Sequence, residues 1–167
     1  MKHSWKIFEL IISGIQICFG LMILFFVAKT ILEYYNILWV NPLIDHKSIV
    51  EVAFRKNSIQ VIVALIAILS GILLIKNLSK GWIMSIITWI MFTILLTIST
   101  YRIYQRNPAE LDLVSRVFIS FLVIVFITIT GMLNSAELRQ KYKPTRSSWI
   151  TIAITITALT SAKFVYT

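Results

Sequence analysis

Charged residues are scarce in this chain of 167 residues, since only 14% are Asp, Glu, Lys or Arg while 58% are hydrophobic. A soluble domain of this length typically carries about 25% charged residues. So few polar side chains cannot cover a water-exposed surface, and we expect lipid to cover much of the molecule. The composition therefore indicates an all-α integral membrane protein with a single membrane domain over residues 1–167.

The residues that usually build catalytic or metal sites are also few. Cys18 is the one cysteine, so the chain can form neither an internal disulfide nor a CxxC redox pair. His3 and His46 are the only histidines, and neither has a second ligand at metal or haem spacing. The G-x-S-x-G, P-loop, GxGxxG and HExxH motifs are missing. We therefore predict a non-enzymatic protein without a cofactor or bound metal.

Acidic residues are outnumbered, with 7 Asp and Glu against 16 Lys and Arg, which gives a net charge of +9. In a soluble protein such an excess would suggest nucleic-acid binding. Here most Lys and Arg residues flank apolar runs, where they reflect membrane topology and anionic lipid headgroups. The expected partners are therefore the lipid bilayer and its anionic headgroups, not nucleic acid.

Long apolar runs dominate what remains. A helix rises 1.5 Å per residue, so about 20 residues cross a hydrocarbon core of about 30 Å. The runs predict a compact bundle of transmembrane helices, with an extramembrane loop at 29–57 that has helical parts and a basic loop at 134–148. The predicted spans are 7–28, 58–75, 82–101, 113–133 and 149–166.

The fifth predicted span is ambiguous. Ile and Thr alternate between Ile150 and Thr157, which is the period of a strand, so four spans are the alternative. A lone strand in lipid would leave its backbone groups without hydrogen bonds, which favours a fifth helix. Lys163 would then extend toward the far membrane interface.

The basic residues also bear on orientation. With the N-terminus inside, the inner and outer segments hold equal numbers of Lys and Arg, but the inner ones lie in shorter connections. The positive-inside rule is weighted toward short loops. We therefore expect a cytoplasmic N-terminus, and the small size and short loops favour a bacterial inner membrane.

Two polar residues lie within the first predicted span. Glu9 is close to Lys2 and Lys6 at the helix start, where the helix dipole favours a carboxylate. Gln16 is near the middle of the span, where its amide needs a partner and an interhelical hydrogen bond is the usual one. Ionisable residues are otherwise missing from the span centres, which argues against a proton-coupled carrier.

The third predicted span carries hydroxyl residues at helical spacing, namely Ser85, Thr88, Thr93 and Thr97. Such a stripe can line a pore, but these side chains often bond to carbonyls of their own helix. We expect Gln16 and these four residues to be interhelical or pore-lining.

The densest basic segment follows the fourth predicted span. It holds Arg139, Lys141, Lys143 and Arg146, which would attract anionic lipid by about 1 kcal/mol per residue near the surface. The same segment can dock an acidic partner or act only as a topology determinant.

These observations favour a non-enzymatic membrane protein that acts as an accessory, assembly or immunity-type subunit. It would work through protein–protein contacts with another membrane protein or in a homo-oligomer. The alternative is a small oligomeric transporter or channel for a neutral solute, built on the hydroxyl residues.

Overall fold

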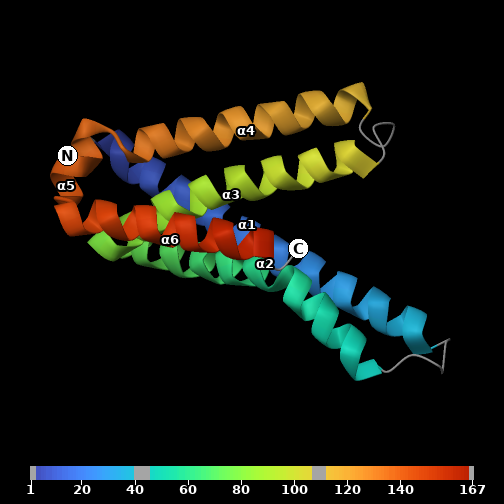
Figure 1. The fold of residues 1–167 in the computed structure, drawn as a ribbon. Helices are drawn as coiled ribbons and strands as arrows, with labels where there is room; N and C mark the ends of the chain where they lie inside the picture. Colours follow the sequence, from blue (N-terminus) through green and yellow to red (C-terminus); the bar gives the residue numbers. More distant parts are fainter. Residues whose placement is uncertain (1–2, 40–45, 107–111, 166–167) are drawn as a thin grey trace.

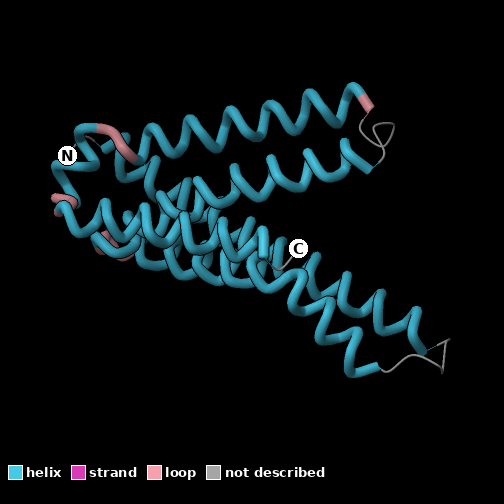
Figure 2. Tube along the Cα trace, viewed as in Figure 1, coloured by secondary structure: helices cyan, strands magenta, loops and turns pink. Residues whose placement is uncertain are grey.

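The computed structural model describes residues 3–39, 46–106 and 112–165, and these residues form helices and no strand (Figure 2). All of the helices except the short α5 are long and apolar enough to cross a membrane. The helices are α1 (His3–Trp39), α2 (His46–Ile75), α3 (Ser79–Arg106), α4 (Leu113–Leu133), α5 (Ala136–Tyr142) and α6 (Arg146–Val165).

The helices converge at one end of the molecule and diverge at the other. α1 packs along α2, α2 packs against α3, and α3 also contacts α4 and α6. Figure 1 shows α5 and the start of α1 at the convergent end, while the α1–α2 pair and the α3–α4 pair separate toward the opposite end. The C-terminal end of α6 lies between the two pairs in this view. α3 is the central helix. In its most apolar stretch 56% of the residues are buried, compared with 11% in α4 and 11% in α6.

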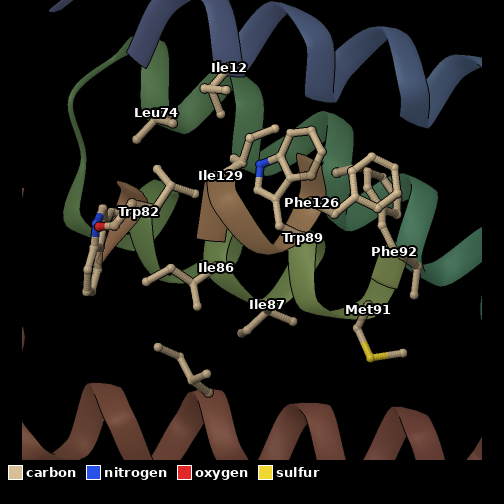
Figure 3. Packing of buried hydrophobic residues seen from close by; sticks show 14 of the residues in the cluster. Ile12, Leu74, Trp82, Ile86, Ile87, Trp89, Met91, Phe92, Phe126 and Ile129 are labelled. Atoms are coloured by element: carbon tan, nitrogen blue, oxygen red, sulfur yellow. The ribbon is translucent and has the colours of Figure 1, made fainter. Parts of the chain in front are cut away.

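Aromatic side chains from three helices fill the centre of the core. Phe19 of α1 lies against Trp89 and Phe92 of α3 and against Phe126 of α4, with ring centroids 5.8–6.4 Å apart. Figure 3 shows Trp89, Phe92 and Phe126 gathered between the helices. Edge-on and tilted aromatic contacts of this kind add to the free energy gained by burial. They fix the α1, α3 and α4 faces relative to one another.

The last apolar run is helical, as the hydrogen-bonding argument predicted. Thr145 and Ser148 exchange hydrogen bonds at its start, with the Ser148 N–H donating to Thr145 Oγ1 at 3.3 Å and the Thr145 N–H donating to Ser148 Oγ at 3.2 Å. This reciprocal pair satisfies backbone N–H groups at the beginning of α6. The Ile–Thr alternation therefore does not reflect a strand.

Both predicted connections contain more helix than the sequence suggested. α1 continues to Trp39 and α2 begins at His46, so much of the predicted loop at 29–57 is helical, and residues 40–45 lie outside the described residues. The predicted basic loop at 134–148 contains α5. Ser135 caps its N-terminus, and Lys143 ends it with a left-handed backbone at φ 45° and ψ 59°.

Candidate functional sites

A polar cluster joins α1, α2 and α3 in the interior. Gln16 Nε2 donates to Ser70 Oγ at 2.5 Å, and the Ser70 and Thr88 hydroxyl oxygens lie 3.4 Å apart. All three side chains are fully buried. The contact between Gln16 and Ser70 is the interhelical hydrogen bond that the sequence predicted for Gln16.

The remaining hydroxyl residues of α3 point in different directions. Ser85 is fully buried, Thr93 is half-buried and Thr97 is exposed. The Thr93 hydroxyl donates to Trp89 O at 3.0 Å and the Thr97 hydroxyl to Thr93 O at 2.8 Å, both within α3. Threonines that bond to their own helix have already satisfied their hydroxyl donors. The four predicted pore-lining residues of α3 therefore do not share one polar path.

We expect Gln16→Leu to lower the free energy of unfolding by about 1 kcal/mol, because the α1–α2 hydrogen bond is lost. Ser13→Ala is the matched control, since the buried Ser13 hydroxyl donates only to Glu9 O of its own helix. Unfolding of both variants by titration with sodium dodecyl sulfate gives the comparison. If Gln16→Leu lowers the free energy of unfolding no more than Ser13→Ala does, the hydrogen bond between Gln16 and Ser70 does not stabilise the fold.

A second polar group lies at the convergent end, and we call Glu9, Asn77, Lys141 and Tyr142 the Glu9 clasp. Lys141 Nζ lies 2.5 Å from Glu9 Oε2 and 2.6 Å from Asn77 Oδ1. The Tyr142 hydroxyl donates to Glu9 Oε1 at 2.7 Å. Glu9 is 4% exposed. A carboxylate at this depth needs both a cation and hydrogen bonds to offset its desolvation, and the clasp supplies both.

Aromatic side chains surround the clasp. The ring of Trp82 stacks on Tyr142 with centroids 6.0 Å apart, and Trp149 meets Trp82 edge-on at 5.8 Å. The Trp82 indole N–H donates to Leu133 O at 2.8 Å, which ties α3 to the end of α4. Burial, the hydrogen bond to Glu9 and the negative charge of Glu9 all raise the pKa of Tyr142 above its usual range. Tyr142 therefore stays a neutral hydrogen-bond donor at physiological pH.

The clasp shows which groups meet Glu9 and Lys141. The sequence indicated only that Glu9 lies near the start of a helix, close to Lys2 and Lys6 in the chain, and in the structure its cation is Lys141, which follows it by 132 residues. Lys141 was expected to contact lipid or a partner, but its ammonium group is held inside the protein, with 19% of its side chain exposed. Arg139, Lys143 and Arg146 are exposed, so contact with lipid or a partner stays a prediction for them.

A basic cavity lies at the opposite, divergent end, between α2, α3 and the C-terminal end of α6. Lys163 lines it and is 4% exposed, so its side chain lies within the protein at this end. Sequence reasoning did not find this cavity, because its basic residues come from three helices. In the sequence, Arg55, Arg102 and Lys163 each lie near the end of a different predicted span, and nothing indicates that these ends meet.

Among the described residues, no group of three or more His, Cys, Asp and Glu side chains lies close enough together to hold a metal ion. Comparison with protein-family models, with curated proteins and with solved structures finds no match for this chain.

Proposed function

We propose that this chain is a polytopic integral membrane protein with five transmembrane helices, and that it acts as a non-enzymatic accessory or assembly subunit. Its contacts with another membrane protein, or with further copies of itself, would be made within the bilayer and at the basic segment around α5. We place the N-terminus and α5 on the cytoplasmic side of a bacterial inner membrane, in keeping with the positive-inside rule.

The exposed apolar face of α4 carries this proposal. Val117, Phe121 and Ile124 follow one another at helical spacing and are each about 60% exposed, at 62%, 60% and 63%. Large aromatic and branched side chains in such a row must be covered by lipid or by protein. α4 packs mainly against α3, so most of the surface of α4 is available to another helix. Figure 1 shows α4 at one side of the molecule.

The interior supports a subunit over a transporter for neutral solutes. Gln16 bonds to Ser70 across helices, while Thr88, Thr93 and Thr97 bond within α3. Side chains occupied in this way stabilise packing and leave few groups to replace the hydration shell of a passing solute.

The first test is extraction of the tagged chain from its own membrane in mild detergent, followed by mass spectrometry of what accompanies it. We expect one membrane protein, or further copies of this chain, in near-stoichiometric amount. The double variant Phe121→Ala/Ile124→Ala should lower that recovery by about tenfold or more, because interface aromatic and aliphatic anchors dominate binding.

The matched control is Leu21→Ala/Phe25→Ala on α1, which removes two side chains of similar size that are 54% and 66% exposed. Recovery of the partner should be unchanged in this control. A chain that extracts as a monomer without a partner would contradict the proposal, and so would equal losses in both double variants. A third variant, Arg139→Ala/Lys143→Ala, tests the basic segment while leaving Lys141 in the Glu9 clasp.

A further inference from the structure

The basic cavity at the divergent end has the composition of an anion site. Its volume is about 760 Å³, and among the described residues its lining contains five cationic side chains and no carboxylate. Arg55 also has an acidic neighbour, Glu51, whose carboxylate lies 3.1 Å away and outside the lining. The five cationic residues are Arg55, Lys56, Arg102, Arg106 and Lys163.

The cations crowd one another. Lys163 is 4% exposed, and the positive charges of Arg102 and Lys56 both act on its ammonium group. Like charges at close range repel one another. A bound anion would offset that repulsion, because it would accept charge-assisted hydrogen bonds from the same groups.

Neutral donors complete the lining. Asn57, Gln60 and Ser99 contribute amide and hydroxyl groups to the cavity. Arginine forks combined with lysine point charges and neutral donors suit an oxyanion with several acceptor oxygens, of which phosphate is the common biological example.

The depth of the cavity fits the same ligand. α3 spans residues Ser79–Arg106, which at 1.5 Å per residue is about 42 Å long, against about 30 Å for a hydrocarbon core. The last turn of α3, with Arg102 and Arg106 at its ends, therefore falls in the headgroup layer when the helix crosses a bilayer. Phosphate groups of lipids occupy that layer.

We propose that the cavity between α2, α3 and the end of α6 binds a phosphate-bearing anion, supplied either by a lipid headgroup or by a soluble phosphate compound. This inference goes beyond the proposed subunit role and shares with it only the insertion in a membrane. Partner binding and anion binding involve different surfaces, α4 on one hand and the cavity on the other.

The test uses the full chain in two arms. In the first, the chain is purified with an equimolar supply of phosphatidylglycerol and phosphatidylcholine, and native mass spectrometry measures which lipid it retains. In the second, the chain is placed in phosphatidylcholine nanodiscs, and its thermal stability is measured with inorganic phosphate or chloride at equal ionic strength. A lipid ligand predicts retention of phosphatidylglycerol, and a soluble ligand predicts stabilisation by phosphate.

The deciding variant is Arg102→Gln/Lys163→Gln, which should weaken whichever binding is seen by about tenfold, since hydrogen bonds to charged groups are lost. The matched control Lys76→Gln/Lys80→Gln removes the same charge from two exposed residues at the convergent end and should leave binding within about twofold. The charge-conserving variant Arg102→Lys/Lys163→Arg should retain most of the binding. Lys56→Gln/Arg106→Gln alters two exposed cavity residues. It gives the same test if Arg102→Gln/Lys163→Gln folds poorly because Lys163 is buried.

The proposal is overturned if neither phosphatidylglycerol nor phosphate is preferred by the wild-type chain. It is also overturned if both double-Gln variants at the two ends lose binding equally, because attraction would then follow net charge alone. Failure of the chain to enter nanodiscs would count against membrane insertion, which separates that outcome from the absence of a binding site.

Discussion

Gly81→Ala should lower the free energy of unfolding by about 3 kcal/mol or more, because there is no room for a methyl group between α2 and α3. A Cβ atom at Gly81 would lie 2.5 Å from Leu73 C and from Leu74 N, both of which are backbone atoms of α2. A side chain could rotate away, but backbone in a helix cannot. The start of α3 would have to shift, and Trp82, which is fully buried beside Gly81, would lose its packing.

Two other glycines provide matched controls for this prediction. A Cβ atom at Gly14 or Gly131 would meet no atom within 4 Å, so Gly14→Ala and Gly131→Ala should leave stability unchanged or raise it slightly. Thermal unfolding in one detergent, followed by circular dichroism, compares the three variants. If Gly81→Ala unfolds at the same temperature as the two controls, the close approach of α2 and α3 is not as the structure has it.

The helical elements were the predictable part of this fold. Apolar runs of about 20 residues identify helices that can cross a membrane because hydrocarbon thickness sets their length. A lone strand in lipid would leave its backbone groups without hydrogen bonds, so α6 could also be predicted as a helix. The Ile–Thr alternation alone would have favoured a strand, as it would in an aqueous protein.

The helix ends were less predictable. Charged residues such as Glu33 mark the end of a hydrophobic run, but they do not end a helix, and α1 continues past them to Trp39. Glu33 and Lys29 even face each other at helical spacing, 3.7 Å apart. The short α5 was missed because hydropathy carries no information on helices outside the membrane. Its N-cap, Ser135, was a usable local signal.

Contacts between distant segments could not be predicted from the sequence alone. Gln16 was expected to find an interhelical partner, but nothing in its own span identifies Ser70. Glu9 lies 132 residues before Lys141, and both have nearer residues of opposite charge in the sequence. An ionisable residue inside a span is a signal that a partner must exist, and only the packing of the helices identifies it.

Lys141→Met should lower the free energy of unfolding by about 3 kcal/mol, because it leaves a buried carboxylate without its cation. Glu9 is 4% exposed, so its carboxylate cannot turn to water as the Lys141 ammonium partly can. The hydrogen bond from Tyr142 remains, but one neutral donor does not replace a cation. The end of α5 should then separate from α1, and faster cleavage by trypsin after Arg139 would report it.

The double variant Glu9→Gln/Lys141→Met distinguishes this electrostatic role from simple packing. With the carboxylate removed, no charge is left buried, and a coupling of about 1 kcal/mol or more should make the double variant more stable than the sum of the single changes predicts. Lys143→Met removes an exposed charge two residues away and should change neither stability nor cleavage measurably. Additive losses in the double variant would mean that Glu9 and Lys141 contribute independently, and that α5 is held to the bundle by Leu138 and Tyr142 alone.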